Sequence, residues 1–137
     1  MNDYFDLHAD KTILDTVSAL GLAHLGDAVY ELMARSYVCL RGKATAKGLH
    51  KAAVGYVAAP AQARMAEAIK PLFTEAEADV FRRGRNASPH SIPQHASREE
   101  YAAATALEAL FGWLWLRGEK SRLNELFEKM MEAHDGT

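Results

Sequence analysis

The stretch LAHLGDAVYE, residues 22–31, has the apolar periodicity of an amphipathic helix, yet it holds a glycine followed directly by an aspartate. Neither Gly26 nor Asp27 favours a helix interior, where glycine costs about 1 kcal/mol relative to alanine. The apolar residues that would form the buried face are Leu22, Leu25, Val29, Leu32 and Met33. Asp27 then lies near the edge of that face, and Gly26 lets another helix or a ligand approach closely. We therefore expect the pair to serve packing or chemistry.

The rest of the chain also predicts helices, because no stretch shows sustained alternation of apolar and polar residues. The predicted fold class is all-α, with six to seven helices. The expected helices span residues 12–20, 22–40, 46–57, 60–73, 74–84, 97–116 and 121–134. Thr45 is a plausible N-cap, and Thr74 with Glu77 and Ser97 with Glu100 have the spacing of capping boxes. Residues 87–96 lack periodicity and are predicted to form an exposed loop.

The composition predicts one soluble domain over residues 1–137, with 49% hydrophobic and 25% charged residues. Cys39 is the only cysteine, which excludes a disulfide framework and fits a reducing, cytoplasmic environment. No signal peptide opens the chain, and the most apolar run, residues 106–116, is too short to span a bilayer. The histidines lack metal-ligand spacing, and no glycine-rich phosphate loop is present.

The charges are unevenly distributed, although the formal net charge is only -2. No acidic residue occurs in residues 32–66 or in residues 82–98. The basic residues of these two segments are Arg35, Arg41, Lys43, Lys47, Lys51, Arg64, Arg82, Arg83, Arg85 and Arg98. A basic face on an acidic protein favours an anionic partner, with nucleic acid as the main candidate. Uneven solvated charge on an ordinary helical domain is the alternative.

Glu108 is the second carboxylate in an unexpected place, because it interrupts the most apolar helix of the chain. A carboxylate in such a run is usually paired, hydrogen-bonded or bound to a metal. Two carboxylates brought together from packed helices repel each other, and a divalent cation relieves that repulsion. Carboxylate oxygens and retained waters are the ligands that Mg²⁺ prefers. A structural ion pair for either residue is the alternative.

Three motifs occur in a specific order along nearly the whole chain: LAHLGDAVYE, then FRRGRNA at residues 81–87, then YAAATALEALFGWLWL at residues 101–116. Together they resemble the Mini-III branch of the ribonuclease III family. The resemblance implies an all-α catalytic domain, a homodimer, and cleavage of double-stranded RNA that leaves 5′-phosphate and 3′-hydroxyl ends. It also implies a Mg²⁺ cofactor, with Mn²⁺ as a substitute, and identifies Asp27 and Glu108 as the catalytic, metal-binding residues.

The sequence departs from the pattern of full-length ribonuclease III enzymes. We expect no double-stranded-RNA-binding domain after the catalytic one. Leu20, Ala23 and Thr105 stand where those enzymes have acidic residues, and His24 replaces an aromatic residue of the classical dimer interface. Only Asp27 and Glu108 are therefore expected as site residues, with Glu31 as a supporting candidate.

Since one domain must then hold the duplex itself, the basic segments are the expected RNA-binding surface. The candidates at the end of the fifth predicted helix are Arg82, Arg83, Arg85 and Asn86, and those on the third are Lys47, His50 and Lys51. The resemblance further implies maturation of precursor 23S ribosomal RNA, with a ribosomal protein as a candidate stimulator. The alternatives are a catalytically inactive, dimeric RNA-binding scaffold and a protein-interaction domain that docks a partner through residues 113–116.

Overall fold

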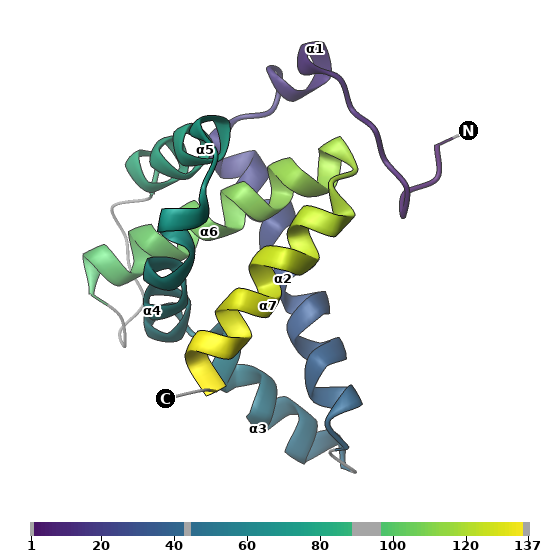
Figure 1. The fold of residues 1–137 in the computed structure, drawn as a ribbon, viewed down its shortest axis with the longest axis vertical. Coiled ribbons are helices and arrows are strands. Elements are labelled where there is room, and N and C mark those ends of the chain that lie inside the picture. The colour runs from purple at the N-terminus through teal and green to yellow at the C-terminus, as the bar shows by residue number, and fades with distance from the viewer. Residues whose placement is uncertain (1, 43–44, 89–96, 136–137) are drawn as a thin grey trace.

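A computed structural model describes residues 2–42, 45–88 and 97–135 (Figure 1). These residues form seven α-helices and one 3-10 helix, and they contain no strand. The elements are α1 (Lys11–Leu14), α2 (Ala19–Leu40), α3 (Ala46–Val57), α4 (Ala59–Ile69), η1 (Lys70–Leu72), α5 (Glu75–Asn86), α6 (Arg98–Arg117) and α7 (Lys120–Asp135). The predicted all-α class is confirmed. None of the helices in the described residues is both long and apolar enough to cross a membrane.

Three predicted helix starts are confirmed by side-chain caps. The Thr45 hydroxyl accepts a hydrogen bond from the backbone N–H of Gly48 at 3.0 Å and starts α3. Both capping boxes form, Thr74 with Glu77 at α5 and Ser97 with Glu100 at α6. These caps satisfy backbone N–H groups that have no partner within their own helix. The start of each of these helices is therefore determined locally.

Three predicted helix boundaries are wrong: the end of the first helix, the start of the second, which was predicted at residue 22, and the end of the fourth. The helix predicted for residues 12–20 ends at Leu14, because the Ser18 hydroxyl accepts from the N–H of Gly21 and starts α2 at Ala19. The helix predicted for residues 60–73 ends at Ile69 and continues as the 3-10 helix η1. Pro71 lies in this turn, and proline lacks the N–H that another α-helical turn would need.

Helix α6 lies at the centre of the fold, with α2, α4, α5 and α7 packed around it (Figure 1). Its apolar residues Leu107, Leu110, Phe111 and Leu114 are fully buried. The buried face of α2 includes Leu22, Val29 and Tyr30, as predicted for the first two, but Leu32 is 52% exposed. Leu32 lines an open groove between α2 and α7.

The interface between α2 and α6 is the most extensive helix–helix contact, and it depends on two glycines. A Cβ atom on Gly26 would lie 1.6 Å from the backbone oxygen of Glu108. A Cβ atom on Gly112 would lie 2.1 Å from the backbone oxygen of Leu22. Both separations are far below van der Waals contact, so the two backbones touch only because neither residue has a side chain. This close crossing explains the glycine at position 26.

Helix α7 is attached to the rest of the fold by polar contacts at both ends. Near its start, the Arg122 guanidinium donates to both carboxylate oxygens of buried Glu77, at 2.8 and 2.7 Å, and to the carbonyl of Leu72 at 2.7 Å. At its end, Asp135 accepts hydrogen bonds from the hydroxyls of Tyr37 and Tyr56. These contacts fix α7 against α5 at one end and against α2 and α3 at the other.

Candidate active site

Asp27 and Glu108 come together where α2 crosses α6. Asp27 follows Gly26 directly, and Gly26 packs against the backbone of Glu108. The Asp27 side chain is on the exposed side of α2, whereas Glu108 is half-buried. The glycine that lets the helices touch therefore also places the two carboxylates beside each other, and the structure brings together the two residues that the sequence analysis singled out.

The Glu108 carboxyl is strongly perturbed by this position. Its pKa is raised to about 8, first by burial, then by the negative charge of Asp27 and a hydrogen bond with Asp27. A hydrogen bond from Gln62 acts in the opposite direction and lowers the pKa. Burial disfavours the charged form of an acid, and a second carboxylate nearby disfavours it further. In the absence of a cation, the pair therefore favours a proton on Glu108 at neutral pH.

Gln62 is a third polar residue of the site and was missed by the sequence analysis. It lies on α4, is 2% exposed, and its Nε2 donates to the backbone oxygen of Val57 at 2.8 Å and to Oε2 of Glu108 at 3.5 Å. Its Oε1 is buried without a hydrogen-bond partner among the described residues. One signal was present in the sequence, because Gln62 lies at helical spacing from the apolar residues Met65, Ala66 and Ile69.

The other polar candidates do not join the pair. Glu31 forms an ion pair with Arg35 one turn along α2, at 2.8 Å. Thr105 is buried, and its hydroxyl donates to the backbone oxygen of Tyr101 at 3.0 Å. Within the described part of the chain, no three histidine, cysteine, aspartate or glutamate side chains could hold a metal ion together. The carboxylates of the site are therefore Asp27 and Glu108.

This donor set fits a hard divalent cation. Mg²⁺ keeps several waters and is commonly bound through only one or two carboxylates. A cation between Asp27 and Glu108 would remove the repulsion that now raises the pKa of Glu108. Glu108 and Asp27 are accordingly the side chains that could hold such an ion.

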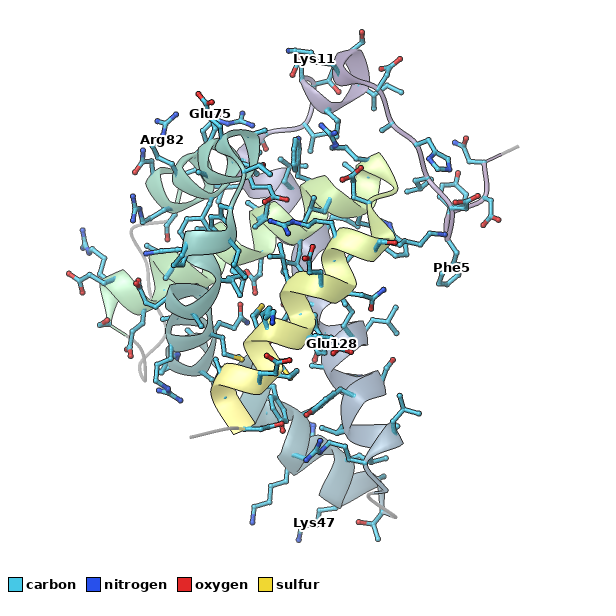
Figure 2. All side chains as sticks on the ribbon, in the orientation of Figure 1. Phe5, Lys11, Lys47, Glu75, Arg82 and Glu128 are labelled. Atoms are coloured by element: carbon cyan, nitrogen blue, oxygen red, sulfur yellow. The ribbon has the colours of Figure 1, made fainter. Side chains whose placement is uncertain are left out.

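The predicted RNA-binding residues form two separate groups. Arg82 and Arg83 both pair with Asp79 on α5, whereas Arg85 and Asn86 are exposed and, within the described residues, Arg85 forms no ion pair. The second group, Lys47, His50 and Lys51, is exposed along α3. Figure 2 shows Lys47 and Arg82 at opposite ends of the molecule. Residues 89–96 of the predicted loop lie outside the described residues.

A groove of about 760 Å³ lies elsewhere on the surface, between α2 and α7. Its apolar lining includes Leu32, Met33, Leu40, Phe127 and Met131, and it contains neither Asp27 nor Glu108. This groove is therefore separate from the carboxylate pair.

Comparison with known proteins identifies the family. The ribonuclease III domain matches residues 20–119. A Mini-ribonuclease 3 from Symbiobacterium thermophilum is 46% identical over 113 residues, which cover 82% of this chain and 87% of the relative. One from Thermoanaerobacter sp. is 41% identical over 118 residues, 86% of this chain and 83% of the relative.

The fold has a close counterpart in a crystal structure of a Fusobacterium nucleatum protein. The two share a TM-score of 0.80 and 29% identity over 90% of this chain and 98% of that one. The matched segment, residues 20–119, includes both carboxylates and the α2–α6 crossing. The chain thus belongs to the Mini-ribonuclease 3 branch of the ribonuclease III family and is an endoribonuclease.

Proposed function

We propose that this endoribonuclease cleaves double-stranded RNA at a Mg²⁺ site held by Asp27 and Glu108, with Mn²⁺ as a substitute. The observation that supports the proposal most directly is the carboxylate pair at the α2–α6 crossing, which is unfavourable without a cation. When bound, the cation would activate water for attack on phosphorus and stabilise the charge that develops on the phosphate. Hydrolysis would leave 5′-phosphate and 3′-hydroxyl ends.

The residues of the chain have distinct parts in this proposal. Glu108 projects from a helix whose backbone is fixed by the glycine contact with α2, so the point from which its side chain extends is fixed. Asp27 lies on the exposed side of the pair, where a phosphate of a bound duplex would approach. Glu31, paired with Arg35, would act only indirectly.

The proposed substrate contacts come from both basic groups. Arg85 and Asn86 on α5, and Lys47, His50 and Lys51 on α3, would bind phosphates and 2′-hydroxyls, since A-form RNA is recognised mainly through these groups. Arg82 and Arg83 would first have to exchange Asp79 for a phosphate. We further propose a homodimer, in which two Asp27–Glu108 pairs face opposite strands of one duplex.

The natural substrate in this proposal is precursor 23S ribosomal RNA, with a ribosomal protein as a candidate stimulator. The support is the relationship to proteins named Mini-ribonuclease 3 and the sequence resemblance described above. A catalytically inactive RNA-binding scaffold is the alternative. Retention of two mutually repelling carboxylates argues against it, because a scaffold gains nothing from them.

Incubation with a long perfect RNA duplex, in Mg²⁺ or in EDTA, tests the proposal. Glu108→Ala protein and a DNA duplex of matching sequence are run in parallel, and Glu128→Ala, which removes an exposed acid from α7, is the control. We expect cleavage of RNA alone, by the wild type and the control, and none in EDTA or by Glu108→Ala. Binding without cleavage, in Mn²⁺ and low salt as well, would support the scaffold instead.

A further inference from the structure

Gln62 connects the end of one helix to the carboxylate pair. Helix α3 ends at Val57, and the last carbonyls of a helix have no partner within it. The hydroxyl of Tyr30 donates to the carbonyl of Tyr56 at 2.8 Å, and Nε2 of Gln62 donates to that of Val57 at 2.8 Å. The same Nε2 lies 3.5 Å from Oε2 of Glu108. One amide nitrogen therefore contacts both the α3–α4 corner and Glu108.

The contact with Val57 fixes the orientation of the Gln62 amide. If the amide were turned over, Oε1 would face the Val57 carbonyl oxygen, and two acceptors would meet without a hydrogen between them. With Nε2 held in this position, Gln62 presents an N–H to Glu108 and cannot present its oxygen there. A donor stabilises the charged form of a carboxylate, which is the form that binds a metal.

Stability alone does not account for a glutamine at this position. Gln62 is 2% exposed and packed beside buried Met65 and Ala66, so an apolar side chain of similar shape would fit the same space. The glutamine leaves Oε1 buried without a partner in the described residues, and an unsatisfied buried acceptor lowers the stability of the folded state. A leucine or methionine could supply neither of the two contacts that the glutamine gains, the hydrogen bond to the Val57 carbonyl and the contact with Glu108, and only the second bears on the site.

We propose that Gln62 is a positioning residue that holds the Glu108 carboxylate, through Nε2, in the orientation that accepts the divalent cation. This inference rests on the proposed function, because it takes Glu108 as a metal-binding residue. Partners that orient a metal ligand typically change metal affinity by 10–100-fold when they are removed. Gln62 touches no surface that a duplex could reach, so RNA affinity should not depend on it.

The test measures Mn²⁺ binding without RNA, by the loss of the free-ion signal in electron paramagnetic resonance. Gln62→Met removes the amide and keeps the size of the side chain, and Met65→Leu is the matched buried change one turn along α4. We expect about tenfold weaker Mn²⁺ binding for Gln62→Met and no change for Met65→Leu. RNA affinity in EDTA should be unchanged for both, and cleavage by Gln62→Met should recover at high Mg²⁺.

Two outcomes would overturn the inference. Unchanged Mn²⁺ binding by Gln62→Met would mean that the amide serves only Val57, and an equal loss in Met65→Leu would mean a general effect of disturbing α4. Gln62→Leu is the second variant if Gln62→Met does not fold. It also lacks the amide and should bind Mn²⁺ about tenfold more weakly, and an unchanged affinity would contradict the contact. Failure of the proposed function is distinct, because Glu108→Gln would then bind Mn²⁺ as the wild type does.

Discussion

Glu108 combines two unfavourable conditions, since it is half-buried in an apolar helix and lies beside a second carboxylate. On an exposed helix, a glutamate could relieve either condition by turning its side chain toward solvent. Here the contact with Gly26 fixes the backbone from which the Glu108 side chain extends. The strain is therefore electrostatic and depends on pH. Ribonuclease activity gives a reason for keeping it, because a site arranged for a cation is necessarily poor without one.

We predict that Glu108→Gln raises thermal stability in EDTA, and more so at higher pH. The pKa of Glu108 is about 8 in the folded protein against 4.5 in the unfolded chain, so folding favours the protonated form. Wild-type stability should fall as pH rises from about 4.5 to about 8, because ionising Glu108 costs more in the folded state. The neutral amide has no such dependence.

Melting temperatures at pH 5, 7 and 9 test this prediction. The melting temperature of the variant should exceed that of the wild type, and the difference should grow with pH. The corresponding difference in the free energy of unfolding should reach about 1 kcal/mol or more, since one unit of pKa shift corresponds to about 1.4 kcal/mol. Glu128→Gln, an exposed acid on α7, should show no such trend. Added Mg²⁺ should stabilise the wild type alone. A margin that stayed constant with pH would contradict the assigned electrostatics.

The sequence predicted Asp27 and Glu108 because each is a charged residue in an apolar helix, where charge is conspicuous. Gln62 was missed because glutamine is common in helices, so its presence in a predicted helix does not by itself indicate a functional site. Its role depends on Val57 and Glu108, which are far apart in the chain and meet only in the folded structure. Such a contact has no local signature.

At the scale of helices, local signals determined the starts better than the ends. The caps at Thr45, Thr74 and Ser97 involve neighbouring residues only, and all three predictions are confirmed. The error at residues 12–20 arose because Ser18 was not recognised as a cap. For the crossing of α2 and α6, the sequence predicted only that another helix or a ligand could approach Gly26 closely. It did not predict that this partner is α6, because one sequence does not identify the partner helix.

We predict opposite effects of adding one methyl group at two helical glycines. Gly26→Ala would place Cβ 1.6 Å from the Glu108 backbone oxygen, so α2 and α6 must separate, at a cost of about 3 kcal/mol or more. Gly55→Ala, in the last turn of α3, meets nothing within 4 Å and should gain about 0.5–1 kcal/mol. Gly26→Ala should also abolish cleavage by moving Asp27 away from Glu108.

Urea denaturation followed by circular dichroism gives both free energies of unfolding, and the RNA cleavage assay gives the activity. Gly55→Ala is the matched control, because it makes the same chemical change in a helix without a close neighbour. A stable, active Gly26→Ala protein would show that the two helices do not need backbone contact. The close crossing would then not be what places the carboxylates.

At the scale of the whole molecule, the two basic groups lie far apart. Figure 2 shows Lys47 near the start of α3 and Arg82 on α5, at the other end of the protomer. The sequence predicted the separation of charge along the chain but not this distance, which depends on how α3 and α5 pack around α2 and α6. The groups therefore cannot bind neighbouring phosphates from the same protomer, and each should contribute on its own.

Independent phosphate contacts make a quantitative prediction for the salt dependence of RNA binding. Each lost contact should reduce the slope of log affinity against log salt by about 1. Lys47→Ala with Lys51→Ala should lower the slope by up to about 2, and Arg85→Ala by about 1, because Arg85 has no competing acid among the described residues. Arg82→Ala should lower it less, since Arg82 already pairs with Asp79.

Combining the α3 and α5 substitutions should lower the slope by the sum of the separate effects, because distant sites without shared partners act additively. Binding in EDTA, measured from 50 to 300 mM salt, would test this without cleavage. Lys129→Ala, which removes a lysine paired with Glu132 on α7, is the control and should leave the slope unchanged. If the α3 variants matched the control, the duplex would not reach α3, and the RNA-binding surface would be confined to the end of the molecule that carries Arg85.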